Sequence, residues 1–464
     1  MAVVFIVKPT IPQETIEKED LPPDLSLIKE ARRLVSLHGE KAWPGFGTDL
    51  PPILLETDEF SYLIGLNAET PEGFRKIEGQ NEILGKPNDQ DLSKTIATRP
   101  IAGNRTVVAP PRKQLGQLLE RETDKSNCRM SKYDYVQKLI EGIFKVHILQ
   151  FFGDHEGFLS GLGSRSSQDD IKTRLEDSAK TNWKSRLMNL VETLSRGLEV
   201  DDLSGAREAV GKNVRLTGDP SGGLGNDVRE FERSVQLLDG TARYVGINTM
   251  SEASKKEIDL TSEISYPDPG KIKFNLLKRL NQPLKSRSSV KERLKDLGAA
   301  KGMLLDRLFP GWKEILLEDK VSLNGLLDRA LEVPEQLESF PITKVRVAGY
   351  ELTVGLAEEP EQRQQGLMYV TDLGSLDGMV FYFPREVQGG FWMKNTKIPL
   401  QIGYFRSSGE LARSMLMKPC RSASCPTYSP GKSYRYALEL PTDSRLRLRD
   451  HPKATIDLSY HPGD

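Results

Sequence analysis

The sequence lacks long apolar runs, an excess of charge of either sign, and more than a few cysteines. Its longest uninterrupted apolar run covers residues 2–7, far short of the ~18 residues that a membrane-spanning helix needs. Its 464 residues include 65 Lys and Arg against 66 Asp and Glu, a formal net charge of −1. This balance argues against a nucleic-acid-binding tail and an acidic disordered chain. The start lacks the features of a signal peptide, so we expect a cytoplasmic location by default, or an extracytoplasmic one if a leader was removed.

The three cysteines leave several chemical states open. Cys420 and Cys425 are close enough in sequence for a small disulfide loop, whereas Cys128 is remote. The pair could instead remain as free thiols. A zinc site would need about four ligands, and only Cys128 and distant histidines could complete one. A disulfide between Cys420 and Cys425 would indicate a compartment outside the cytoplasm.

The spacing of apolar residues predicts two regions of different structure. Two short strands are expected within residues 51–66, and a polar loop over 76–112. From about 113 to 332, apolar residues recur three and four positions apart, which predicts helices. After residues 333–341, interpreted as a linker, the period becomes two, which predicts strands. We therefore expect an α+β protein, with a mainly helical domain containing a few N-terminal strands over 1–332 and a small β-rich domain over 342–464.

The C-terminal part contains a series of short motifs in a specific order. They are Gln-Gly-Leu-Met (365–368), Gly-Met-Val-Phe (378–381), Phe-Trp-Met-Lys-Asn-Thr (391–396) and Tyr-Ala-Leu-Glu-Leu (436–440). Together they resemble the bacterial and archaeal family called domain of unknown function 192. Gln365 departs from this family, which often has a basic residue at that position. The resemblance implies a compact β-rich fold and no known reaction.

Polar and aromatic residues within these motifs are candidates for a ligand pocket. Trp392 could line such a pocket, while Lys394, Asn395 and Arg363 orient a ligand. The alternative is that the aromatic residues of this segment pack in the core. Because no His or Ser–His pair lies near the polar residues, nucleophilic catalysis finds no support. If this domain acts, we expect it to bind a ligand.

The N-terminal part resembles a second group, uncharacterised bacterial proteins that look like zinc peptidases. The similar stretches are residues 38–65, 227–247 and 298–316. In such peptidases a helix carries H-E-x-x-H, whose two histidines hold zinc and whose glutamate activates water. The corresponding helix here covers residues 142–150. His147 matches the second histidine, but Ile143 and Phe144 occupy the positions of the first histidine and the glutamate. The later carboxylate ligand would be Asp239.

The chemistry of these replacements predicts a degenerate peptidase-like domain. One histidine and one aspartate cannot make a three-ligand zinc site, and Phe144 cannot act as a general base. A relocated metal site would have to combine His147 and Asp239 with His155 and Glu156, although the 154–156 segment is interpreted first as a polar turn or helix stop. His147 on an apolar helix face is otherwise a core histidine, and Asp239 is a candidate partner for it.

These observations lead to a main functional hypothesis and two alternatives. We expect a non-catalytic binding or interaction protein that requires no metal or cofactor and acts on an unknown ligand or protein partner. The first alternative is a metal-dependent hydrolase with a relocated ligand set, and the second is a subunit or scaffold of a larger assembly. No nucleic-acid role is expected, because charge is balanced and no basic stretch interleaved with aromatic residues occurs.

Overall fold

The computed structural model describes most of the chain and divides it into two compact units. The described residues are 21–66, 69–77, 80–87, 96–101, 104–115, 130–152, 182–218, 226–255, 264, 268–282, 287–319, 321–420 and 424–458. Among them, the first unit takes those up to 150 and from 245 to 269, and the second takes those from 151 to 244 and from 270 onward. Within these ranges, no helix combines the length and apolar character needed to cross a membrane.

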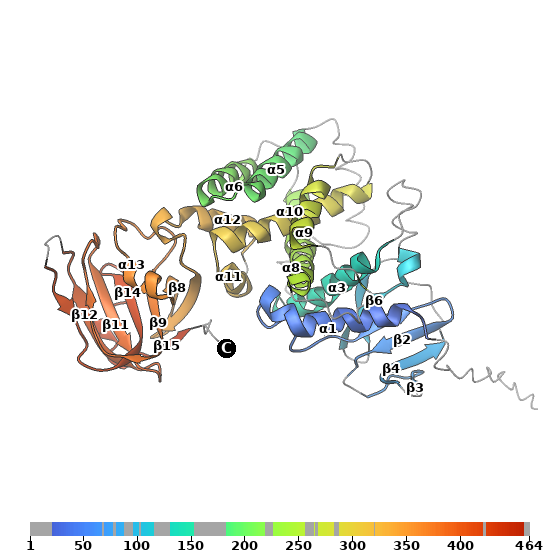
Figure 1. Ribbon diagram of the computed structural model, residues 1–464, viewed down its shortest axis with the longest axis horizontal. Coiled ribbons are helices and arrows are strands. Elements are labelled where there is room, and N and C mark those ends of the chain that lie inside the picture. The colour runs from blue at the N-terminus through green and yellow to red at the C-terminus, as the bar shows by residue number, and fades with distance from the viewer. Residues whose placement is uncertain are drawn as a thin grey trace, which may run out of the picture. The chain divides into compact units, whose positions relative to one another are not determined.

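The first unit combines helices with a six-stranded sheet (Figure 1). Its strands are β1 (Ile53–Glu56), β2 (Phe60–Ile64), β3 (Arg75–Ile77), β4 (Gln80–Pro87), β5 (Ala97–Ile101) and β6 (Asn104–Ala109), in the order β3-β4-β2-β1-β6-β5. Only the β1–β6 pair is parallel. Helix α1 (Asp24–Ala42) and nearly all of helix α3 (Lys132–Phe152) lie in the same unit as the sheet. A Cβ added to Gly142 of α3 would lie 3.0 Å from Val107 of β6, so the helix packs closely on that strand.

This sheet confirms one expectation and corrects another. The two strands expected within residues 51–66 are β1 and β2. The polar loop expected over 76–112 was wrong, because β4, β5 and β6 lie there. Strand β4 buries Ile83 and β6 buries Val107 and Val108, but polar residues flank these short apolar runs, so the composition of the segment resembles that of a loop.

The helical part of the second unit contains a π-helix. Its elements are α5 (Asn182–Glu199), α6 (Leu203–Gly218), α7 (Asn226–Val235), the π-helix η5 (Gln236–Gly240), α9 (Pro269–Leu280), α10 (Arg287–Leu308), α11 (Trp312–Asp319) and α12 (Leu323–Glu332). Helix α8 (Thr241–Lys255) follows η5 directly and continues into the first unit. A Cβ on Gly298 of α10 would lie 2.3 Å from the Gln236 carbonyl oxygen. The absence of a side chain at Gly298 therefore allows α10 to contact the π-helix backbone.

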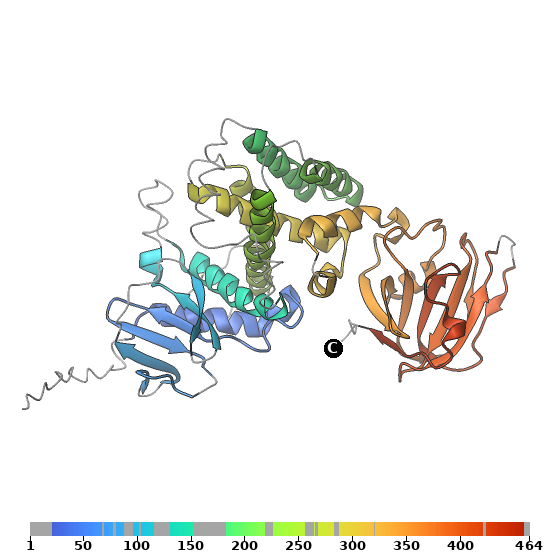
Figure 2. The same ribbon diagram turned by 180° about the vertical axis from the view of Figure 1, so that it is seen from behind.

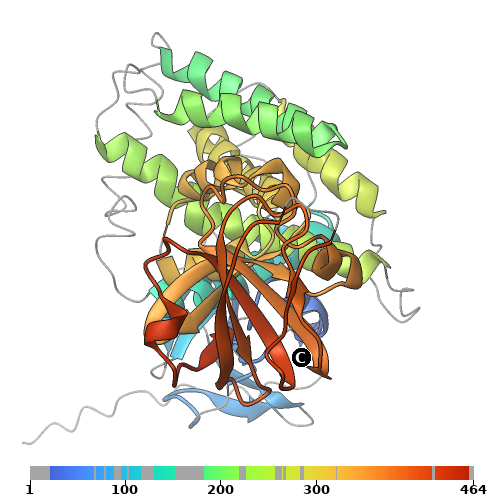
Figure 3. The same cartoon turned by 90° about the vertical axis from the view of Figure 1, so that its left-hand side faces the viewer.

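The C-terminal part of the second unit is a curled seven-stranded sheet (Figures 1 and 3). It contains β7 (Ile342–Val347), β8 (Tyr350–Ala357), β9 (Gly378–Val387), β11 (Leu400–Phe405), β12 (Leu411–Met417), β14 (Tyr434–Pro441) and β15 (Ile456–Leu458), in the order β12-β11-β14-β9-β8-β7-β15. The curl brings its ends together, since Leu411 N–H donates to the Ala454 carbonyl (2.9 Å) and Ile456 N–H to the Gly409 carbonyl (2.8 Å).

The two faces of this sheet have different surroundings. Val354, Val380 and Leu438 point to an apolar core inside the curl. Because side chains alternate along a strand, Met379 and Glu439 belong to the opposite face, called here the outer face. The connections that follow β8, β9 and β12 contain α13 (Pro360–Gln365), β10 (Phe391–Trp392) and β13 (Thr427–Tyr428), of which β10 and β13 pair with each other. Figure 2 shows the sheet from behind.

The architecture confirms the expected fold class. A mainly helical region with N-terminal strands is followed by a β-rich region, so the protein is α+β. The expected domain division, with a linker over 333–341, stays a prediction, since both sides of that segment belong to the second unit. Within the segment, residues 335–337 form the short helix η6 (Glu335–Leu337).

Candidate ligand-binding face of the C-terminal sheet

The segment after β10 turns sharply around a buried methionine. Met393 is fully buried, and its carbonyl oxygen accepts hydrogen bonds from Thr396 N–H (3.2 Å) and Cys420 N–H (3.4 Å). Lys394 forms an isolated parallel bridge with Cys420. These backbone contacts fix the segment, while the side chain of Trp392 stays 49% exposed.

Two residues in left-handed backbone conformations hold this segment against the preceding connection. Tyr369 has φ +67° and Asn395 has φ +58°. Tyr369 N–H donates to the Asn395 carbonyl (2.9 Å), and Asn395 Nδ2 donates to the Tyr369 hydroxyl (2.7 Å). A tyrosine at positive φ is strained, and strain of this kind clusters at functional sites.

Tyr369, Trp392, Lys394 and Asn395 together form what we call the loop face. The Lys394 ammonium lies 5.1 Å from the centre of the Trp392 ring, within the range of a cation–π interaction. The Tyr369 ring is 55% exposed. The loop face therefore presents two aromatic rings, one ammonium and one amide to solvent, a combination that can stack on a flat ligand and pair with an anionic group.

Arg363 lies apart from the loop face. Its guanidinium donates to the carbonyls of Glu358 and Tyr382, the latter at 3.1 Å, and lies 5.2 Å from the centre of the Phe383 ring. These contacts join α13 to β9. No hydrogen bond or ring contact of the described residues connects Arg363 with Trp392, Lys394 or Asn395. Its proposed role in ligand binding stays a prediction.

A disulfide joins Cys420 to Cys425 next to the loop face, with their Cα atoms 5.8 Å apart. The sequence left a disulfide, free thiols and a zinc site open for this pair, and the structure contains the disulfide. Cys128 lies outside the described residues.

Sequence reasoning missed two residues in this region. Tyr369 follows the Gln-Gly-Leu-Met motif but has no signal beyond its proximity to it. Glu439 lies in the motif Tyr-Ala-Leu-Glu-Leu, yet it is only 4% exposed. Burial raises the pKa of the Glu439 carboxyl from 4.5 to about 8. An acidic residue inside an otherwise apolar strand motif was the available signal.

Helix α3 of the first unit, in which the sequence suggested the remnant of a peptidase motif, is a packed apolar element at the positions concerned. Ile143 and Phe144 are fully buried, and the Phe144 ring makes edge contacts with Trp43 (5.0 Å) and Phe46 (5.2 Å). His147 is 8% exposed and lies 5.4 Å from the Phe46 ring. Burial lowers the pKa of His147, partly opposed by a hydrogen bond with the Pro44 backbone.

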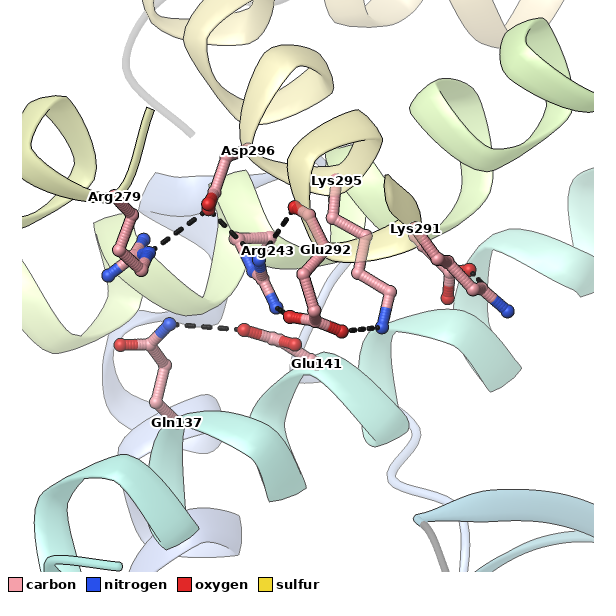
Figure 4. A network of polar contacts seen from close by, with 9 residues as sticks. Gln137, Glu141, Arg243, Arg279, Lys291, Glu292, Lys295 and Asp296 are labelled. Atoms are coloured by element: carbon pink, nitrogen blue, oxygen red, sulfur yellow. Dashed lines mark hydrogen bonds and ion pairs between the residues drawn. The ribbon is translucent and has the colours of Figure 1, made fainter. Parts of the chain in front are cut away.

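Asp239 lies in the π-helix of the second unit and has a partner there. Its carboxylate is 3.4 Å from the Lys291 ammonium. Nearby, Arg243 pairs with Asp296 (2.9 Å) and Glu292 (2.6 Å), and Arg279 and Lys295 add further ion pairs with these two acids (Figure 4). The predicted contact between His147 and Asp239 stays a prediction, because the two residues belong to different units.

The relocated metal site stays a prediction. His155 and Glu156 lie outside the described residues. Within the part of the chain that the structure describes, no three His, Cys, Asp or Glu side chains are grouped as metal ligands would be.

Comparisons with known proteins bear on the C-terminal part. Residues 343–451 match the family model DUF192, described as "Uncharacterized ACR". This match confirms the resemblance of the C-terminal motifs to that family. No curated protein matches the chain. The resemblance of the N-terminal part to zinc peptidases stays a prediction.

Two solved structures are similar to about a quarter of the chain. One is a protein from Sinorhizobium meliloti 1021, described as a candidate transcription regulator, with 31% identity over 26% of this chain and 95% of its own. The other, from Novosphingobium aromaticivorans DSM 12444, is described as a protein of unknown function, with 23% identity over 28% of this chain and 91% of its own. The TM-scores of 0.23 and 0.24 support no functional argument.

Proposed function

We propose that the chain is a non-catalytic binding protein and that the loop face is its ligand-binding surface. The observation that carries this proposal is the mutual hydrogen bonding of Tyr369 and Asn395, both in left-handed conformations. It holds a strained backbone that leaves two aromatic rings exposed, an arrangement that packing alone does not require.

The chemistry of the loop face favours a small aromatic carboxylate as the ligand. The Trp392 and Tyr369 rings offer flat apolar surfaces, and Lys394 beside the Trp392 ring can pair with a carboxylate. Asn395 adds amide groups that fix orientation. The absence of a nucleophile–base pair among these residues supports binding rather than reaction.

Titration of the full chain with indole-3-acetate tests this proposal by saturation-transfer NMR. We expect binding by the unaltered protein and at least about tenfold weaker binding by Trp392→Ala, because stacking is lost. Leu416→Ala is the matched control, since Leu416 is 56% exposed on β12 and outside the loop face. Equal binding by all three proteins, or no binding by any, would reject the loop face as the site for this ligand class.

We also propose that the N-terminal region is a peptidase-like scaffold without zinc hydrolysis. The burial of Ile143 and Phe144 in an aromatic cluster supports this, because these positions face apolar side chains rather than a metal. Elemental analysis of untagged, unchelated protein is the test. About one zinc per chain, with peptide hydrolysis that chelators stop, would favour the metal-dependent hydrolase instead.

A further inference from the structure

The Cys420–Cys425 disulfide joins two backbone segments that hold the loop face in place. Cys420 N–H donates to the Met393 carbonyl (3.4 Å), and Cys420 forms a parallel bridge with Lys394. Cys425 lies two residues before β13, which pairs with β10 at Trp392. The disulfide therefore connects the segment that contacts Lys394 with the segment that pairs with Trp392.

The backbone contacts that the disulfide connects are few and weak. Strands β10 and β13 pair over two residues each, and a two-stranded pair on its own is marginally stable at best. The hydrogen bond from Cys420 to Met393 is longer than N–H···O bonds usually are. In the chain-entropy model, a disulfide restricts the alternative conformations of the segment that it closes. It therefore favours the arrangement in which both contacts are made.

Strand β13 has additional anchors, whereas the Cys420 side depends on the contacts described above. The Tyr404 hydroxyl donates to the Tyr428 carbonyl (2.5 Å), and Lys418 N–H donates to the Tyr428 hydroxyl (3.1 Å). Neither bond involves the disulfide. We therefore expect loss of the disulfide to release Cys420 and residues 393–396 before it affects β13.

Both cysteines are within reach of a reductant. Neither is buried, and the residues on either side of Cys425, Ser424 and Pro426, are exposed. Thiol–disulfide exchange requires an attacking thiolate to reach one of the two sulfurs, and exposed disulfides are the labile ones. This disulfide can therefore exchange with a thiol from solution without unfolding of the sheet.

We propose that reversible reduction of the Cys420–Cys425 disulfide is a switch that releases Lys394 and Trp392 from their positions in the loop face. A dithiol reductant supplies the reaction. One of its thiolates attacks a sulfur of the disulfide, and its second thiol resolves the mixed disulfide, so two electrons and two protons pass to the cysteines while the reductant becomes a disulfide. Reoxidation by a disulfide oxidant reverses the step. The effect on ligand binding rests on the proposed function, whereas the release of the segment does not.

Hydrogen exchange of the full chain with and without dithiothreitol tests this proposal. In the reduced protein, we expect residues 393–396 and Cys420 to exchange at least about tenfold faster, because their contacts open more often. The amides of β11 and β14 should keep their rates, since these strands pair with each other along their length. Removal of the reductant and addition of glutathione disulfide should restore slow exchange.

Two variants make the result specific. The double variant Cys420→Ser, Cys425→Ser should exchange fast without a reductant and should not respond to dithiothreitol. Cys128→Ser removes the remaining cysteine and should respond as the unaltered protein does. Unchanged exchange over residues 393–396 on reduction would overturn the proposal. Equally faster exchange in β11 and β14 would also overturn it, because the disulfide would then stabilise the sheet in general.

Titration with indole-3-acetate in both redox states separates this proposal from the proposed function. If the loop face binds this ligand, reduction should weaken the binding about tenfold, because Trp392 and Lys394 are no longer held together. Equal binding in both states would overturn control of binding by the disulfide. Absence of binding in both states would reject the proposed ligand class, and the exchange rates would still decide whether the disulfide is a switch.

Discussion

Lys301 on α10 is a single residue whose charge state is set by burial. It is 1% exposed, and its ammonium donates to Gln236 Oε1 and Asn324 Oδ1, both at 2.5 Å. Both acceptors are neutral amides. Burial lowers the pKa of Lys301 from 10.5 to about 7, although the charge of Glu232 opposes part of this effect.

This lowered pKa predicts that protein stability rises with pH between about 7 and about 10.5. In that window the unfolded chain binds the proton and the folded chain does not, so raising the pH favours the folded state. The contribution is at most about 1.4 kcal/mol per pH unit. Below about pH 7, Lys301 is protonated in both the folded and the unfolded state. The folded protein then carries the full cost of burying the charged ammonium.

Urea unfolding at about pH 7 and about pH 9 measures this effect in Lys301→Met and the unaltered protein. As the pH rises, we expect the unaltered protein to gain stability relative to Lys301→Met, because the variant has no buried ammonium that can lose its proton. Lys271→Met, at an exposed position of α9, should show no such shift. A constant difference for Lys301→Met would contradict the assignment.

At the same scale, the sequence predicted which residues form most of the loop face, but it did not predict the burial of Glu439. Trp392, Lys394 and Asn395 lie in one motif, so their proximity was predictable. Glu439 alternates with Leu438 and Leu440, which point to the core. Alternation alone assigns Glu439 to solvent, yet the residue is only 4% exposed in the structure. Tyr369 joins the loop face through backbone conformations that tyrosine rarely adopts.

At the scale of elements, the π-helix η5 depends on two glycines that face each other. A Cβ on Gly298 would lie 2.8 Å from Gly240 Cα as well as 2.3 Å from the Gln236 carbonyl oxygen. These backbone atoms of η5 cannot move away from the added Cβ unless α10 separates from η5. We therefore expect Gly298→Ala to destabilise the protein by roughly 2–4 kcal/mol.

Gly211→Ala on α6 is the matched control for this prediction. Its Cβ would meet only Leu331 Cδ1, at 3.9 Å, so the gain in helix propensity should stabilise the protein by about 0.5–1 kcal/mol. Thermal unfolding of both variants provides the measurement. If Gly298→Ala were as stable as Gly211→Ala, the close backbone contact would be disproved.

The predictability of elements follows the strength of their apolar patterns. Helices such as α5 and α10 have apolar residues three and four apart and were expected. The strands β4 to β6 were missed, because their apolar runs are short and are flanked by polar residues, as in a loop. The π-helix has no distinct sequence period, and the glycine contact that accommodates it joins residues about 60 positions apart, which no local pattern reports.

At the scale of the whole molecule, the sequence predicted the order of helical and β-rich regions but not the way they contact within the second unit. Buried Lys344 of β7 donates to Asp319 of α11 and, at 2.6 Å, to Glu351 of β8. Asp319 also accepts from Arg329 of α12 (2.5 Å). Residues that are far apart in sequence therefore form an ion-pair network between the helices and the sheet, which apolar periodicity does not predict.

This network predicts that Asp319→Asn weakens the attachment of β7 to the helices. Lys344 is 2% exposed as a side chain, so loss of one carboxylate leaves its charge with Glu351 alone. We expect a destabilisation of about 2 kcal/mol, below the cost of breaking a fully buried pair. Burial raises the pKa of Asp319, but hydrogen bonds from Lys344 and Arg329 outweigh it and hold the pKa below 3.8. The network should therefore be intact above this pH and lost as the pH falls further.

Hydrogen exchange measures this coupling strand by strand. In Asp319→Asn, the amides of β7 and β8 should exchange faster, while those of β11 and β14 keep their protection, because the latter strands lie farther across the sheet. Asp457→Asn, at an exposed position of β15, should leave all four strands unchanged. If only α11 and α12 lost protection in Asp319→Asn, the network would stabilise the helices without joining them to the sheet. The two parts would then be independent folding units, as the predicted linker implies.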